Sequence, residues 1–191
     1  MNWANRLTIA RFFLTIGFVA VLTLAVPFSG TIALALFIVA SITDYLDGWM
    51  ARKFSMKTPF GALMDPLVDK IMTAAAFICL IPIAHVPAWV VIVIISREFV
   101  ITGLRLLALS QGKVLSAESI GKHKTGWQMA TVIFFLMGIA LVEIFPSLGG
   151  TPLFRKIWPI GEVLCLSMAV ALTAYSGMAY LWRHRAMIQP G

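Results

Sequence analysis

Long apolar runs separated by short polar links are the feature that most constrains how this chain can fold. Hydrophobic residues make up 60% of the 191 residues, and the mean hydropathy is +0.93, which is far above that of soluble domains. A helix needs about 20 apolar residues to cross the hydrocarbon of a bilayer, where backbone polar groups must bond within their own segment. The pattern therefore predicts an all-α integral membrane protein built as a bundle of helices.

The apolar runs indicate six candidate transmembrane helices. They extend roughly from Thr8 to Val26, Thr31 to Trp49, Pro66 to Ala84, Pro87 to Ala108, Trp127 to Phe145 and Trp158 to Trp182. The links are short and several contain proline or glycine, and no repeat or low-complexity linker divides the chain. We therefore expect a single transmembrane domain over residues 1–191.

The positions of the basic residues predict both topology and partners. The net charge is +7, but the lysines and arginines lie in the links rather than on one soluble face, which favours anionic lipid and phosphate over nucleic acid as partners. The two ends and the even-numbered links hold ten of them: Arg6, Arg52, Lys53, Lys57, Arg105, Lys113, Lys122, Lys124, Arg183 and Arg185. The opposite links hold only Arg155 and Lys156. By the positive-inside rule, both termini should be cytoplasmic.

Three further basic residues, Arg11, Lys70 and Arg97, lie inside the predicted spans. A charge at that depth costs at least ~2.5 kcal/mol unless it is paired or hydrated. These residues are therefore candidates for a functional role, although Lys70, next to Asp69, is better interpreted as a structural partner of that carboxylate.

All the aspartates of the chain fall in one stretch. Asp44 and Asp47 are three residues apart, and Asp65 and Asp69 are four apart, so on helices each pair shares one face. Like charges so close together must either become protonated or bind cations. Carboxylates in this number suit two Mg²⁺ or Mn²⁺ ions, which can clamp a diphosphate and stabilise the entering and leaving oxygens. The chemistry indicated is phosphoryl transfer.

Small residues next to the aspartates leave space beside the helix backbone. Gly48 and Ala51 follow Asp44 on the same helical side, and Gly61 lies in the second half of the stretch, so a flat base or ribose can approach there. Arg52 offers a planar fork to phosphate. The alternative is that the small residues only allow helices to pack closely, as they do in many membrane proteins.

The stretch resembles the signature of the CDP-alcohol phosphotransferases. The pattern D-x-x-D-G-x-x-A-R-x8-G-x-x-x-D-x-x-x-D is matched without departure from Asp44 to Asp69. The resemblance implies a six-helix membrane fold, usually dimeric, with two divalent metal ions between the second and third helices near the cytoplasmic surface. It implies metal ligands at Asp44, Asp47, Asp65 and Asp69, with Asp69 also taking the proton of the attacking hydroxyl. It implies a CDP site lined by Gly48, Ala51, Arg52, Gly61 and Thr8.

A second polar stretch bears on the acceptor of the reaction. Arg97 and Arg105 are eight residues apart, so on a helix they project from nearby sides about two turns apart, and Lys124 follows in the next link. An acceptor that carries its own phosphate needs such cations, because four aspartates would otherwise repel it. Glycerol 3-phosphate fits this requirement. In the alternative interpretation Arg97 pairs with Glu98 or an aspartate, Arg105 ends a helix, and Lys124 belongs to a basic turn that attracts anionic lipid.

Shorter motifs resemble those of the phosphatidylglycerophosphate synthases within the family. These are Asn5-x-Leu7-Thr8-x-x-Arg11, the R-E-x-x-x-x-x-L-R pattern that starts at Arg97, and the G-K-x-K-T-x-x-Q pattern that ends at Gln128. The resemblance implies transfer of the phosphatidyl group of CDP-diacylglycerol to sn-glycerol 3-phosphate, with CMP as the leaving group. The compact chain without a transit peptide favours a bacterial inner membrane, with the site facing the cytoplasm.

Other functions fit parts of the pattern. The same family includes cardiolipin synthases and phosphatidylserine synthases, which use other acceptors. Membrane prenyltransferases also combine aspartates with Mg²⁺, but their chains are longer and carry two separate aspartate-rich motifs, whereas this chain has one composite cluster. A divalent-cation transporter needs carboxylates across the membrane, whereas the half opposite the aspartates offers only Glu143 and Glu162.

Overall fold

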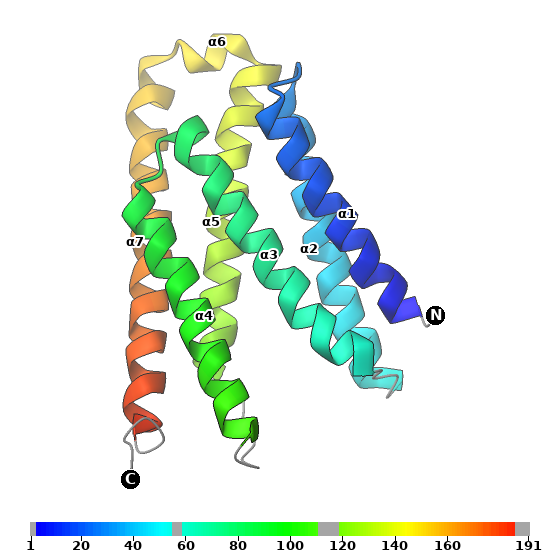
Figure 1. Cartoon of the computed structure of the whole chain (residues 1–191). Helices are drawn as coiled ribbons and strands as arrows, with labels where there is room; N and C mark the ends of the chain where they lie inside the picture. The colour runs from blue at the N-terminus through cyan, green and yellow to red at the C-terminus, as the bar shows by residue number, and fades with distance from the viewer. Residues whose placement is uncertain (1–2, 55–58, 111–118, 186–191) are drawn as a thin grey trace.

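The fold consists of helices throughout the part of the chain that the structure describes. The computed structural model describes residues 3–54, 59–110 and 119–185, with side chains for residues 6–44, 67–108, 110 and 124–185. In chain order the helices are α1 (Trp3–Thr23), α2 (Ser29–Phe54), α3 (Pro59–Ala84), α4 (Ala88–Ser110), α5 (Ser119–Ile144), α6 (Pro146–Gly149) and α7 (Pro152–Arg183) (Figure 1). The predicted all-α class is confirmed, and each predicted span corresponds to one of the long helices.

Several helices are apolar enough to cross a membrane. Within the described residues, four stretches meet the requirement of length and composition, namely Arg6–Thr23, Leu67–Ala84, Lys124–Ile144 and Pro152–Arg183. The apolar helical stretch Ser29–Asp44 is shorter. Helix α4 is not among the four, and it carries Arg97, Glu98 and Arg105 along its length. The chain is an integral membrane protein, and the number of six spans stays a prediction.

Proline marks the start of most helices. Pro59, Pro146 and Pro152 are the first residues of α3, α6 and α7, and Pro87 directly precedes α4. Proline suits the first turn because its missing N–H has no partner there in any case. Thr151 caps α7, where its hydroxyl accepts a hydrogen bond from the backbone N–H of Phe154 at 3.4 Å.

The helices are longer than the apolar runs that predicted them. α3, α5 and α7 begin several residues before the expected spans, at Pro59, Ser119 and Pro152. Hydropathy reports where a helix meets hydrocarbon, whereas the helix itself continues until a proline or a cap ends it. As a result, Asp65 and Lys124 lie on helices rather than in links.

The packing of the helices places α5 at the centre of the bundle. α5 contacts α2, α3 and α7, while α1 packs against both α2 and α3, and α4 packs against α7 and α3. Short α6 joins α5 to α7 at the end of the bundle opposite the two chain termini (Figure 1). Large apolar side chains from five of the long helices, α1 to α5, are buried in the core; examples are Phe18, Phe37, Phe77, Leu80, Ile94 and Leu136.

A carboxylate of α5 caps the start of α2. Glu143 accepts hydrogen bonds from the backbone N–H groups of Gly30 and Thr31 and from the Thr31 hydroxyl, each at 2.8 Å. The first N–H groups of a helix have no partner within the helix, and a negative charge there also complements the helix dipole. Residue 30 must be a glycine for this approach, because a Cβ atom would run into Ile139. Glu143 therefore has a structural role.

The contact between α5 and α7 depends on another glycine. Trp158 of α7 stacks on Phe134 of α5, with ring centroids 4.4 Å apart, and on Phe154, with centroids 5.1 Å apart. The indole of Trp158 lies directly against Gly138, so a Cβ atom at residue 138 would overlap with it. Because two other rings hold the indole, it has little freedom to move aside.

The substitution Gly138→Ala should therefore destabilise the protein. We expect the loss to be about 1–3 kcal/mol, which is the usual cost of an overpacked core, and to lower the thermal unfolding temperature in detergent. Gly103→Ala is the matched control, because nothing lies within 4 Å of a Cβ atom there. An unfolding temperature of Gly138→Ala equal to that of the control would contradict this account of the α5–α7 contact.

Candidate active site

An ion pair joins α1 to the aspartate stretch. Arg11 of α1 is completely buried, and its Nη1 atom lies 2.6 Å from Oδ1 of Asp44 on α2. A buried guanidinium needs a counter-charge, and Asp44 provides one while keeping about a third of its side chain exposed. The sequence singled out Arg11 as a charge inside a span, and the structure shows that this charge orients Asp44.

Asp69 of α3 has a buried oxygen that is available for a cation. Within the described residues, its Oδ1 atom is buried and has no hydrogen-bond partner. The carboxylate also interacts electrostatically with Asp44, Arg11, Lys70 and Lys124. An unsatisfied buried carboxylate oxygen is costly unless a proton or a metal ion occupies it. This feature fits a divalent cation next to Asp69.

The complete carboxylate cluster lies partly outside the described side chains. Asp44 and Asp47 are both on α2, and Asp65 and Asp69 are both on α3, so the helical spacing predicted from the sequence is present. The side chains of Asp47 and Asp65 are not among those described. Among the side chains that are, no group of three potential metal ligands occurs. The four-aspartate metal site therefore stays a prediction.

Four of the five expected CDP-binding residues lie near the end of α2 or the start of α3. Gly48, Ala51 and Arg52 occupy the last turns of α2, and Gly61 lies in the first turn of α3. What surrounds them lies outside the described side chains. Thr8 is buried on α1, about one turn before Arg11. The role of all five in binding CDP stays a prediction.

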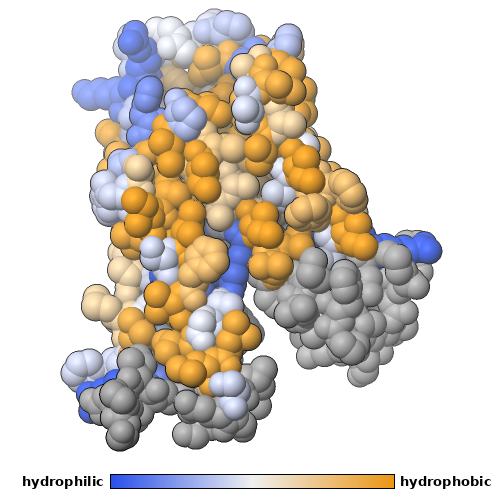
Figure 2. Space-filling model, in the orientation of Figure 1, coloured by the Kyte–Doolittle hydropathy of each residue, from blue (hydrophilic) through white to orange (hydrophobic). Residues whose placement is uncertain are grey.

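A cavity of about 450 Å³ opens beside Asp69, between α3, α4 and α5. Its polar lining consists of Asp69, Lys70, Thr73, Glu98, Thr102, Arg105, Lys124, Thr125 and Gln128. The remaining walls are apolar and include Leu67, Ile71, Ile94, Ile95, Phe99 and Leu106. Figure 2 shows hydrophilic surface inside the hollow between α3 and α4, surrounded by the hydrophobic surface of the bundle. The cavity thus combines a charged floor with walls suited to lipid.

One face of α4 supplies the polar groups of this cavity. Glu98, Thr102 and Arg105 follow one another at intervals of four and three residues, which places them on one side of the helix. Glu98 forms an ion pair with Lys124 of α5. The Lys70 ammonium donates a hydrogen bond to the Thr102 hydroxyl, which in turn donates to the Glu98 carbonyl at 2.7 Å. These contacts tie α3 and α5 to the same face of α4.

The three cations expected at the acceptor do not all line the cavity. Arg105 and Lys124 do, and the Arg105 guanidinium also lies over the Tyr180 ring of α7, 5.7 Å from its centroid. Arg97 instead packs against Gly177 of α7, and its Nη1 atom lies 3.1 Å from Oε1 of Glu98. The pairing of Arg97 with Glu98, which the sequence left open as an alternative, is present. Arg97 as a ligand of the acceptor phosphate stays a prediction.

Sequence reasoning did not place Glu98 and Lys70 in the cavity. Glu98 was considered only as a possible partner of Arg97. Lys70 was singled out as a charge inside a span but was interpreted as a structural partner of Asp69, yet both residues line the cavity. The spacing of Glu98, Thr102 and Arg105 was a signal that could have identified Glu98, because it marks one polar face on an otherwise apolar helix.

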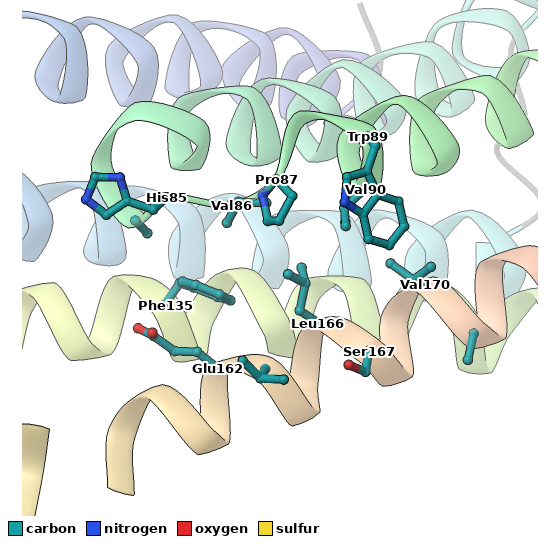
Figure 3. A pocket seen from close by; sticks show the side chains of 13 residues that line it. His85, Val86, Pro87, Trp89, Val90, Phe135, Glu162, Leu166, Ser167 and Val170 are labelled. Atoms are coloured by element: carbon teal, nitrogen blue, oxygen red, sulfur yellow. The ribbon is translucent and has the colours of Figure 1, made fainter. Parts of the chain in front are cut away.

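A second cavity, of about 520 Å³, lies at the other end of α3. It is bordered by the His85–Pro87 link, by α5 and by α7, and its polar side chains are His85, Glu162 and Ser167 (Figure 3). None of its lining residues is an aspartate, a lysine or an arginine. Asp69, Lys70, Arg105 and Lys124, the residues whose charges suit phosphoryl transfer, line the first cavity instead.

The chain is similar to known phosphatidyltransferases over most of its length. The family model described as CDP-alcohol phosphatidyltransferase matches residues 1–175. A Bacillus subtilis (strain 168) protein named CDP-diacylglycerol--glycerol-3-phosphate 3-phosphatidyltransferase is 37% identical, with 94% of this chain and 93% of the relative covered. A Mycobacterium tuberculosis (strain ATCC 25618 / H37Rv) protein named probable phosphatidylglycerophosphate synthase is 34% identical, with 95% of this chain and 81% of the relative covered. An Oryza sativa subsp. japonica protein named cardiolipin synthase (CMP-forming) is 35% identical, with 77% and 56% covered.

The ion pair between α1 and α2 leads to a prediction about metal binding. Arg11→Met should destabilise the metal-free protein by about 3 kcal/mol, at the lower end for a broken buried ion pair, because Asp44 is partly exposed. Mn²⁺ should restore part of this loss, since a metal ion at Asp44 replaces the missing positive charge. Thermal unfolding in detergent, with and without Mn²⁺, measures both effects. Arg155→Met, at an exposed arginine of α7, is the control. Equal unfolding temperatures for the two variants would contradict a stabilising ion pair between Arg11 and Asp44.

Proposed function

Because this chain belongs to the CDP-alcohol phosphatidyltransferase family, we propose that it transfers the phosphatidyl group of CDP-diacylglycerol to sn-glycerol 3-phosphate. The products are phosphatidylglycerophosphate and CMP. The names of the Bacillus and Mycobacterium relatives support this acceptor, and so do the matched motifs around Arg97 and Lys124. The observation that carries the proposal is the cavity in which Asp69 faces the same space as Arg105 and Lys124.

This arrangement suits an acceptor that has a phosphate at one end and a hydroxyl at the other. Arg105 and Lys124 supply positive charge for the phosphate, and Lys70 adds a third cation to the same lining. Asp69 then lies on the side of the cavity where the hydroxyl must be deprotonated. Holding both ends of the acceptor in one cavity converts an encounter of two substrates into an oriented reaction.

Asp69 acts in this proposal as the general base. The hydroxyl oxygen of the acceptor attacks the β-phosphorus of CDP-diacylglycerol in line, the bond from that phosphorus to the CMP oxygen breaks, and the hydroxyl proton passes to the Asp69 carboxylate. The apolar walls of the cavity, which include Ile71, Ile95 and Phe99, accommodate the acyl chains of the donor.

Two divalent ions, Mg²⁺ or Mn²⁺, belong to the same proposal. The family generally depends on divalent metal, and the buried oxygen of Asp69 without a hydrogen-bond partner fits such an ion. Their ligands would be Asp44, Asp47, Asp65 and Asp69. When bound, the ions neutralise the charge of the diphosphate and of the departing CMP. Arg11 keeps Asp44 oriented for this purpose.

The setting proposed for the enzyme is a bacterial inner membrane, with the active site facing the cytoplasm and two copies forming a dimer. The excess of lysine and arginine in the links on the aspartate side supports this orientation. Bacterial relatives that match almost the whole chain support the source. Glycerol 3-phosphate is water-soluble, so a cytoplasmic opening gives it direct access.

The choice of acceptor can be tested with the purified protein in detergent. CMP release is measured with CDP-diacylglycerol and Mn²⁺ or Mg²⁺, and glycerol 3-phosphate, serine, inositol or phosphatidylglycerol is offered separately. We expect turnover with glycerol 3-phosphate alone, because only this acceptor combines a small body with a phosphate dianion, and we expect EDTA to abolish it. Turnover with phosphatidylglycerol instead would favour the activity named for the rice relative.

The role of Asp69 gives a second test. Asp69→Asn keeps the shape of the side chain but cannot accept the proton, so CMP release should fall by about 10²–10⁴-fold at saturating substrates. Glu162→Gln is the matched control, since it makes the same chemical change in the other cavity and should leave turnover unchanged. If Asp69→Asn retains more than about a tenth of the parent rate, another group is the base.

A further inference from the structure

Glu98 is the point where the cations of the active-site cavity meet. Its Oε1 atom is within ion-pair distance of both Arg97, at 3.1 Å, and Lys124. About a fifth of the Glu98 side chain is exposed, and it lines the cavity next to Lys124. A single carboxylate oxygen thus holds a cation from α5 and a cation from its own helix.

Lys124 depends on a counter-charge. Its side chain is 2% exposed, and a buried ammonium without an opposite charge is strongly disfavoured. The lysine side chain also has four flexible methylene groups, so burial by itself does not determine where its charge is located. Glu98 supplies a carboxylate in direct contact with the ammonium, and this contact fixes its position.

Glu98 is itself anchored to α7 through Arg97. The aliphatic stem of Arg97 lies against Gly177, where a Cβ atom would be only 3.0 Å from Arg97 Cγ. Gly177 has no side chain where the Arg97 stem passes, so Arg97 lies close to the α7 backbone. A continuous set of contacts runs from α7 through Arg97 and Glu98 to Lys124.

We propose that Glu98 is a positioning residue for the acceptor, which holds the Lys124 ammonium where it binds the acceptor phosphate. This inference rests on the proposed function of the cavity as the binding site of glycerol 3-phosphate. Glu98 touches no reacting atom in this account and acts through Lys124. Arg97 contributes by fixing Glu98 against α7.

The proposal and a simple argument about charge predict opposite changes in acceptor affinity when Glu98 is removed. Glu98 adds a negative charge to the lining, so its removal makes the cavity more positive, and a dianionic acceptor would then bind more tightly. If Glu98 positions Lys124, however, its removal weakens acceptor binding despite the gain in positive charge. The direction of the change in KM therefore discriminates between the two.

The experiment is a double-mutant cycle in the full-length protein. Glu98→Gln, Lys124→Met and the double variant are compared with the parent, and the KM for glycerol 3-phosphate, the KM for CDP-diacylglycerol and kcat are measured for each. Glu98→Asp is added as the conservative variant, since it keeps the charge and shortens the side chain by one methylene.

We expect Glu98→Gln to raise the KM for glycerol 3-phosphate by about tenfold, which corresponds to about 1.4 kcal/mol, while the KM for CDP-diacylglycerol changes less than about twofold. In the Lys124→Met background the same substitution should change the acceptor KM by less than about twofold, because the group through which Glu98 acts is gone. Glu98→Asp should recover part of the loss. If Glu98 had a purely structural role, Glu98→Gln would raise the acceptor KM by the same factor in the parent and in the Lys124→Met background.

Several outcomes would overturn the proposal. These are a lower or unchanged acceptor KM in Glu98→Gln, equal increases in the KM of both substrates, or full additivity with Lys124→Met. If Glu98→Gln does not fold, Glu98→Asp replaces it in the double-mutant cycle. Its effect on the acceptor KM must then also disappear in the Lys124→Met background. The parent enzyme distinguishes failure of the proposed function from failure of the role of Glu98. If the parent does not use glycerol 3-phosphate, the proposed function is wrong. If the parent uses it but the effects of Glu98→Gln and Lys124→Met are additive, only the role of Glu98 is wrong.

Discussion

The pairing of charges between apolar helices is the constraint on which the rest of this structure depends. A charged side chain at membrane depth is tolerated only with a partner, and here the partners lie on neighbouring helices. Arg11 joins α1 to Asp44 on α2, Lys124 joins α5 to Glu98 on α4, and Lys70 joins α3 to Thr102 on α4. The contacts that stabilise the charges therefore also determine how the helices meet around the cavity.

The end of the bundle opposite the chain termini is built differently. There the helices approach closely at glycines, as Gly30 does beside Ile139 and Gly138 beside Trp158, and the one carboxylate of α5 in this region serves as a helix cap. Close packing of this kind resists deformation. The polar end can then hold several charges in defined positions, because the apolar end provides a rigid frame for the long helices.

The sequence predicted much of this organisation, because hydropathy and helical spacing are local properties. Apolar runs located all the long helices, the aspartate signature identified the family, and the cost of a charge inside a span drew attention to Arg11 before any contact was known. Helix ends were less accurate, since Pro59 and Pro152 determine them rather than hydropathy.

The arrangement of the cations could not be predicted in the same way. The sequence places Arg97 beside Glu98, but it contains no sign that Lys124, on another helix, reaches the same carboxylate. Nor does the eight-residue spacing of Arg97 and Arg105 reveal that Gly177 of α7 leaves just enough room for the Arg97 stem. These relations depend on which helices pack together, and that information lies in the tertiary structure.

The mixed character of the cavity follows from the two substrates that the proposed reaction joins. A lipid donor requires apolar walls that open toward the bilayer, whereas a phosphorylated acceptor requires cations and access to water. α4 resolves this conflict along a single helix, because Glu98, Thr102 and Arg105 face the polar floor while Phe99 and Leu106 extend the apolar walls. A helix apolar on all sides would offer no charge to a phosphorylated acceptor. Glu98 and Arg105, which lower the hydropathy of α4, are therefore also residues that the proposed reaction uses.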